Sequence, residues 1–151
     1  MITILLGIET SDFSEEAVSA VRRQFRPEQV VIHLLNVIDP MIYLPLYEGA
    51  MRDFDRIEAL RNENRESAKE LVERTAKTLR DAGYQVITAV EEGEPRTTIV
   101  DYAKRIKAQL IVVGSHGRRG LPRLLLGSVS EYVTRHAPCS VEIIRELPRA
   151  A

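Results

Sequence analysis

The stretch "AQLIVVGSHGRRGLPRLLLGS", residues 108–128, joins a short apolar run to a loop rich in glycine and arginine. The run 109–114 has the length and the β-branched residues of a strand that is covered on both faces. Glycine loses more backbone freedom on folding than any other residue, so glycines gathered after a strand need a reason. They indicate either a loop through which the backbone approaches a ligand or a flexible, solvated turn.

Four further runs outside this stretch are also apolar and short. They are residues 2–8, 29–35, 84–90 and 139–145. Segments with helical periodicity lie between the runs. We expect helices from Ser11 or Ser14 onward, over 54–82, over 95–107 and over 128–136. This alternation predicts a single α/β domain, doubly wound, with a five-stranded parallel sheet and helices on both faces. The connection 39–53 contains Pro40, Pro45 and Gly49 and is expected to be irregular.

The length and composition of the chain fit one domain over residues 1–146, followed by a flexible tail at 147–151. A formal net charge of -1 argues against a general binder of nucleic acid or of anionic membranes. Cys139 is the one cysteine in the chain, so no internal disulfide can form, which suits a reducing compartment. No apolar run approaches the roughly 20 residues that span a bilayer. We therefore expect a cytoplasmic protein without a membrane segment.

The loop after residue 114 has the features of a phosphate site. Ligands of doubly wound sheets bind beyond the carboxyl ends of the strands, where Gly114 and Gly117 let the backbone come close. Gly127 and Ser128 then open a helix, whose first N–H groups and positive dipole end attract an anion. Positive charge is added by Arg118, Arg119 and Arg123. The spacing G-x2-G-x9-G-S is neither a P-loop nor a dinucleotide fingerprint.

Residues 110–144, "LIVVGSHGRRGLPRLLLGSVSEYVTRHAPCSVEII", resemble the C-terminal signature of the universal stress protein family in its ATP-binding branch. Three earlier segments resemble other parts of the family in the same order: "ILLGIETSDFSEEA" (4–17), "LLNVIDP" (34–40) and "EEGEPRTTIVDYAK" (91–104). The resemblance covers essentially the whole chain. It implies strand order 3-2-1-4-5 and a nucleotide at the carboxyl ends of the first and fourth strands.

The resemblance also implies the residues of the nucleotide site. The backbone of Val37 would meet adenine, and the carboxylate of Glu9 would stand where ATP-binding relatives usually carry aspartate. Magnesium would arrive with the phosphates of ATP, because no carboxylate cluster there would hold it alone. The expected binding residues, with Arg118 included for its charge, are Gly7, Ile8, Glu9, Val37, Gly114, His116, Gly117, Arg118, Gly127, Ser128, Val129 and Ser130.

Several side chains allow a functional and a structural interpretation. His116 contacts the ribose or a phosphate, or is a solvated turn residue. His136 and Cys139 are better explained as a helix-end histidine and a buried strand cysteine than as a reactive pair, and His33 as a core histidine. Ser115 is no credible nucleophile. The charged helix over 54–82 is a solvated face or a partner surface.

These observations favour a small ATP-binding stress-response or regulatory protein that acts mainly by nucleotide-dependent binding. No catalytic residue is assigned, and at most weak ATPase activity is expected. The alternatives are a slow ATP hydrolase or phosphotransferase using His116 or Ser128, and a dimeric structural module with an empty nucleotide site. The resemblance further implies a homodimer through the last strand, 139–145. An unidentified protein partner is a separate expectation.

Overall fold

The computed structural model describes residues 1–9, 11–48, 54–115 and 126–145. Five strands form a single sheet in the order β3-β2-β1-β4-β5, and every pairing is parallel. The strands are β1 (Ile2–Gly7), β2 (Val30–Ile38), β3 (Gln85–Glu92), β4 (Leu110–Gly114) and β5 (Ser140–Ile144). The predicted fold class and strand order are confirmed.

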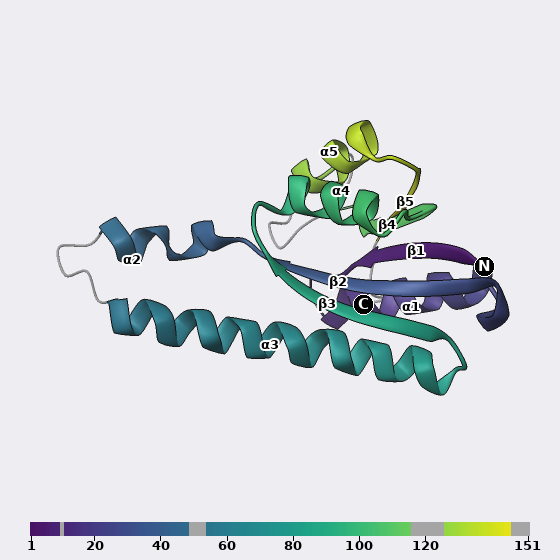
Figure 1. The fold of residues 1–151 in the computed structure, drawn as a ribbon, viewed down its shortest axis with the longest axis horizontal. Coiled ribbons are helices and arrows are strands. Elements are labelled where there is room, and N and C mark those ends of the chain that lie inside the picture. Colours follow the sequence, from purple (N-terminus) through teal and green to yellow (C-terminus); the bar gives the residue numbers. More distant parts are fainter. Residues whose placement is uncertain (10, 49–53, 116–125, 146–151) are drawn as a thin grey trace, which may run out of the picture.

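Helices cover both faces of the sheet, as Figure 1 shows. The helices α1 (Ser11–Gln24) and α3 (Phe54–Asp81) pack on one face. The helices α4 (Pro95–Arg105) and α5 (Ser128–His136) pack on the other. No helix among the described residues is both long enough and apolar enough to cross a membrane.

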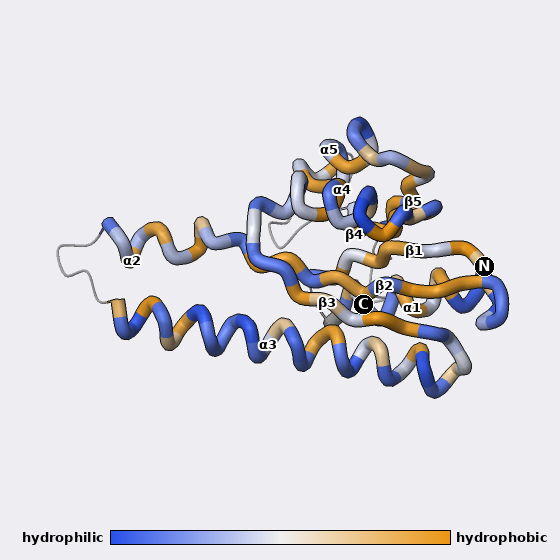
Figure 2. Tube along the Cα trace, in the orientation of Figure 1, coloured by the Kyte–Doolittle hydropathy of each residue, from blue (hydrophilic) through white to orange (hydrophobic). Residues whose placement is uncertain are grey.

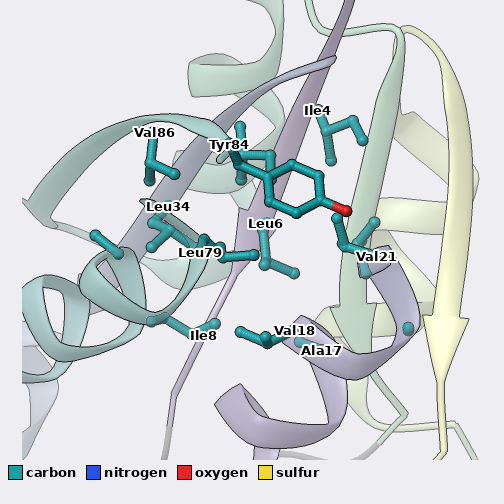
Figure 3. Packing of buried hydrophobic residues seen from close by; sticks show 14 of the residues in the cluster. Ile4, Leu6, Ile8, Ala17, Val18, Val21, Leu34, Leu79, Tyr84 and Val86 are labelled. Carbon is teal, nitrogen blue, oxygen red and sulfur yellow. The ribbon is translucent and has the colours of Figure 1, made fainter. Parts of the chain in front are cut away.

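The core is divided into two layers because side chains alternate along each strand. On β1, Ile4 and Leu6 face α1 and α3, while Leu5 faces α4 and α5. Figure 3 shows Val21 of α1 and Leu79 of α3 on the first of these two sides. Strands buried on both faces read as nearly continuous apolar runs, and Figure 2 shows this along β1 and β2.

The connection between β2 and α3 differs from the prediction. Residues 39–48 were expected to be irregular, but they form a 3-10 helix, η2 (Pro40–Tyr43), and a short helix, α2 (Leu44–Glu48). The side chain of Asp39 accepts a hydrogen bond from the backbone N–H of Met41 (2.9 Å), and Pro40 supplies a helical φ at the first position. An N-cap followed by proline therefore begins a helix where the breakers alone indicated a loop.

The ends of some strands differ from the predicted ends by a few residues. The second strand continues to Ile38, three residues beyond its predicted end, and the last strand begins at Ser140 rather than at Cys139. Gly83 ends α3 with φ +94, as a C′ glycine should. Residues 147–151, predicted to be a flexible tail, lie outside the described part of the chain.

Candidate functional site

The candidate site lies at the carboxyl edge of the sheet, between β1 and β4. These strands are neighbours, with Leu6 paired to Val112, although helices and two other strands separate them in sequence. From β1 the chain continues to β2 on one side, and β4 lies on the other. A doubly wound sheet opens a crevice at this reversal of strand order, and ligands bind there.

The end of β1 is anchored beyond its last paired residue. The backbone N–H of Ile8 donates to the carbonyl of Leu35 (2.9 Å), and the side-chain amide of Asn36 donates to the carbonyl of Ile8 (2.8 Å). Asn36 is buried, and its side chain holds β1 and β2 together at the edge. Glu9 follows directly and is half-exposed. Its carboxylate is therefore carried by a backbone segment with a fixed position.

Asn36 is not among the residues that the sequence predicted for the site. The available signal was a polar residue inside "LLNVID", where neighbours on both sides are apolar. A buried side-chain amide needs hydrogen-bond partners. Such a residue therefore indicates a nearby backbone group that has no backbone hydrogen-bond partner.

The end of β4 meets the beginning of α5. The backbone N–H of Ser115 donates to the carbonyl of Ile144 in β5 (2.9 Å), and its carbonyl accepts from the N–H of Gly127 (2.7 Å). Ser115 and Gly127 therefore lie side by side. His116, Gly117 and Arg118, which the sequence assigned to the site, lie outside the described residues, as do Arg119 and Arg123.

The first turn of α5 presents backbone donors at this edge. Gly127 is the N-cap, and its carbonyl accepts the N–H of Glu131 (3.0 Å). Helix geometry provides no intrahelical carbonyl for the amides of Ser128, Val129 and Ser130, and the positive end of the helix dipole lies here. Ser128 is exposed and Val129 is half-exposed. The turn therefore offers hydrogen-bond donors to an anion, because the helix itself does not use them.

Ser130 contributes differently from its two predecessors. Its hydroxyl is buried and lies 2.9 Å from the carbonyl of Gly127 and 3.2 Å from that of Ser115. A hydroxyl has one proton to donate, so these two carbonyls share it. The side chain of Ser130 thus secures α5 to the end of β4, and only its backbone N–H remains for a ligand.

Gly114 has a packing role in addition to the predicted ligand role. A Cβ atom at this position would lie 3.0 Å from Cε2 of Phe13, closer than ordinary carbon contacts. Phe13 belongs to α1, so the absence of a side chain at Gly114 lets the helix approach the end of β4. At Gly7 a Cβ would meet Val113 at 3.4 Å, which is an ordinary contact.

The β2–β3 side of the edge is held by charged groups from α3. Val37 is half-buried in β2 and is paired with Glu91 of β3. The next residue of β3, Glu92, accepts from Arg61 (2.7 Å) and Arg65 (3.1 Å). These partly exposed ion pairs contribute about 1 kcal/mol or less each, but together they orient the end of β3.

The helix α4 begins at the same edge with a charged cap. The carboxylate of Glu94 accepts from the backbone N–H of Arg96 (3.3 Å) and of Thr97 (3.0 Å). Burial alone would raise the pKa of Glu94, but the hydrogen bonds from Thr97 and Arg96 outweigh it and lower that pKa. The helix start at Pro95 was predicted from the sequence, but the cap by Glu94 was not.

Neither of the two described histidines lies in the crevice. His33 is in the middle of β2, with Nδ1 3.4 Å from the hydroxyl of Tyr102, and burial lowers its pKa. His136 ends α5, where its ring stacks on Tyr132 at a centroid distance of 4.0 Å. Cys139 lies past the end of that helix, and burial raises its pKa, so its thiol is poorly reactive. Within the described ranges, no group of three or more His, Cys, Asp or Glu residues could hold a metal ion.

Comparison with known proteins decides the family. The model of the universal stress protein family matches residues 1–145. The chain belongs to the universal stress protein family. Universal stress protein MJ0531 of Methanocaldococcus jannaschii is 34% identical over 146 residues, a match that covers 95% of this chain and 81% of the relative.

Solved structures show the same fold. The protein MJ0577 superposes with a TM-score of 0.82 at 28% identity, covering 97% of this chain and 96% of that one. A universal stress protein family member of Arabidopsis thaliana, solved with AMP bound, has a TM-score of 0.70 at 19% identity, with coverages of 98% and 94%. At that identity the likeness concerns the fold alone.

The residues that the resemblance assigned to the site fall at this edge wherever the structure describes them. Gly7 ends β1 and is followed by Ile8 and Glu9, Val37 lies near the end of β2, and Gly114 ends β4. Gly127, Ser128, Val129 and Ser130 start α5 beside the end of β4. Segments distant in the sequence thus converge on the crevice of this universal stress protein family member.

Proposed function

We propose that this chain is a cytoplasmic ATP-binding protein of the stress response, which takes ATP with Mg²⁺ at the carboxyl edge between β1 and β4 and acts through nucleotide-dependent binding. The observation that carries the proposal is the bond between the Gly127 N–H and the Ser115 carbonyl (2.7 Å), which holds the start of α5 against the end of β4. Phosphate oxygens are acceptors, and the first turn of α5 supplies donors for them.

The nucleoside would occupy the β1–β2 side of the crevice. A carboxylate accepts hydrogen bonds from ribose hydroxyls, and Glu9 extends from a backbone that Asn36 and Leu35 anchor. The backbone of Val37 would lie beside adenine. The Arabidopsis protein of the same fold was solved with AMP bound, so an adenine nucleotide is the ligand class to test first.

We expect binding with at most slow turnover; a slow hydrolase would use His116, which lies outside the described residues, or Ser128, which is exposed at the start of α5. Ser115 is buried, and the hydroxyl of Ser130 is within bonding distance of two carbonyls, so neither is placed as a nucleophile. Of the described histidines, neither stands at this edge to act as a general base. The phosphates bring the magnesium ion, which would neutralise part of their charge in the bound state.

Two measurements test the proposal. The purified protein is denatured and the supernatant is analysed for released nucleotide, and calorimetry with ATP, ADP, AMP and GTP is carried out in the presence and absence of Mg²⁺. Copurified adenine nucleotide, or ATP binding that GTP does not match, is expected. Absence of both retained nucleotide and measurable ATP binding in a folded protein would reject the proposal.

Glu9 offers a sharper test of the nucleoside position. A well-aligned hydrogen bond to a charged group contributes on the order of 1.5–3 kcal/mol, and Glu9 must fold its longer side chain to reach the position of an aspartate. We expect Glu9→Asp to tighten ATP binding by roughly threefold to tenfold and Glu9→Ala to weaken it. If Glu9→Ala binds as well as wild type, residue 9 is no ligand.

A further inference from the structure

Exposed apolar side chains gather on one projection of the molecule, which we call the arm: η2, α2 and the first turn of α3. Figure 2 shows apolar segments of η2 and α2 extending past the end of the sheet. The exposed large apolar residues of the arm are Met41 (60% exposed), Ile42 (52%), Leu44 (38%), Tyr47 (38%) and Phe54 (61%). In the rest of the described chain four others are comparably exposed, and they are scattered: Met1, Ile2, Ile87 and Leu126.

The arm is attached to α3 by specific contacts. Tyr43 is buried, its hydroxyl accepts a hydrogen bond from the side-chain amide of Asn64 (3.0 Å), and the guanidinium of Arg61 lies 5.9 Å from its ring centroid. Farther out, the rings of Tyr47 and Phe54 are 6.4 Å apart. Tyr43 thus turns inward while its apolar neighbours face solvent. Contiguous apolar surface on a folded element generally marks an interaction site.

The charges around this surface indicate the chemistry of the partner. Among the described residues of the stretch 48–58, Glu48, Asp55 and Glu58 are acidic and Arg56 is basic. The carboxylates of Glu48, Asp55 and Glu58 are exposed, and none forms an ion pair with another described residue. Positive charge on a partner would complement this rim. A second copy would set the same acidic rim against itself across a two-fold axis, and an anionic lipid surface would be repelled.

We propose that the arm docks an amphipathic helix of a partner protein whose apolar face is flanked by lysine or arginine. Helices of this kind lay their apolar side chains on an exposed apolar surface, and flanking charges set the orientation. The unbranched side chain of Met41 adapts to different partners. The arm begins at Pro40, after the end of β2, and its binding can be tested without nucleotide.

The probe is a labelled synthetic amphipathic helix of leucine, alanine and lysine, compared with the same peptide carrying glutamate in place of lysine. Fluorescence anisotropy with nucleotide-free protein is expected to show the lysine peptide binding at least about tenfold more tightly. Ile42→Ser and Phe54→Ser should each weaken that binding by about tenfold, since each removes an apolar anchor. Ile87→Ser is the matched control, because Ile87 is 43% exposed but lies on β3, and it should bind as wild type.

The charge contribution is tested by Glu48→Lys with Glu58→Lys, which should shift the preference toward the glutamate peptide. Equal binding of both peptides to wild type, or equal weakening by Ile87→Ser, would overturn the proposal. Binding of phosphatidylglycerol vesicles that Phe54→Ser abolishes would overturn it in favour of a lipid surface. Self-association in sedimentation that Phe54→Ser abolishes would overturn it in favour of a second copy.

Discussion

The side-chain amide of Asn36 donates a hydrogen bond to the main-chain carbonyl of Ile8 across 2.8 Å in the protein interior. Ile8 lies just past the last paired residue of β1, where the ladder to β2 provides its N–H with a partner in Leu35. Asn36 thus lengthens the anchored part of β1 by one residue. It brings a fixed backbone to the position of Glu9.

Removing this amide should destabilise the protein. Asn36→Ala leaves the buried carbonyl of Ile8 without its donor, which costs about 1–3 kcal/mol. Urea unfolding of the two proteins measures the difference. Asn62→Ala is the control, because Asn62 is exposed on α3 and its loss should change the free energy of unfolding by less than about 0.5 kcal/mol. Equal effects of the two substitutions would show that Asn36 contributes nothing through its hydrogen bond.

Gly114→Ala should overpack the contact with α1. The new Cβ would lie 3.0 Å from Cε2 of Phe13, so the ring must shift, at a cost of about 1–3 kcal/mol. Gly7→Ala is the matched control, since its Cβ meets Val113 at 3.4 Å. Phe13→Leu combined with Gly114→Ala should recover part of the loss in a double-mutant cycle. Strictly additive effects would mean that the two positions do not press on each other.

The stabilisation by the Glu94 cap should depend on pH. Its folded-state pKa is lowered, so its contribution is present above the usual carboxyl value of about 4.3 and is lost as the pH falls through the folded value. At neutral pH we expect Glu94→Ala to cost about 1 kcal/mol, and the gap to wild type should narrow in acid. Urea unfolding at a series of pH values measures this gap. Glu63→Ala, on the exposed side of α3, should show no comparable gap, and a gap for Glu94→Ala that is constant with pH would exclude the ionised cap.

Gly127→Val tests the phosphate site. The backbone at Gly127 has φ -63 and ψ 157, which valine adopts without strain, so the fold should persist. The branched side chain would obstruct close approach to the first turn of α5, and ATP affinity should fall by at least about tenfold. Gly127→Ala should reduce ATP affinity less than Gly127→Val does. Calorimetry decides, with thermal unfolding as the check on folding. Unchanged affinity in a folded Gly127→Val protein would remove phosphate binding from this turn.

The strand β5 is at an edge of the sheet, where it pairs with β4 on one side. We expect two copies to associate through this edge, because no strand of the described residues pairs with its outer side and an open strand edge is a template for another strand. Val141→Pro removes a backbone donor and should shift the protein toward monomer, with circular dichroism as the check on folding. Sedimentation at several concentrations measures the change. A wild-type monomer at all concentrations would contradict the expected dimer.

Much of the fold could be predicted because a strand that is buried on both faces has a nearly continuous apolar sequence. The run 110–114 is apolar throughout because its strand is covered on both faces, and β4 formed where that run predicted it. The helices of the arm could not be predicted from its proline and glycine residues. Pro40 begins a helix because Asp39 caps the turn. That depends on one local hydrogen bond, which proline and glycine content alone does not reveal.

The site was predictable at the level of segments and less so at the level of atoms. The end of the apolar run at Gly114 and the helix start at Gly127 indicated this edge from the sequence pattern, and the family resemblance added Gly7. The roles of Asn36 and of the Ser130 hydroxyl depend on which carbonyls lie near them after folding. Those partners are distant in sequence, so local pattern does not specify them.

The bond between Gly127 and Ser115 has a consequence for protein engineering. It joins residues 115 and 127 to each other, and the N–H of Ser115 also bonds to Ile144 of β5. The entropy of closing a loop grows only slowly with its length once its ends are fixed. Segments of other lengths, such as a peptide epitope or a metal-binding turn, can therefore be grafted between residues 115 and 127 while the sheet and α5 keep their positions.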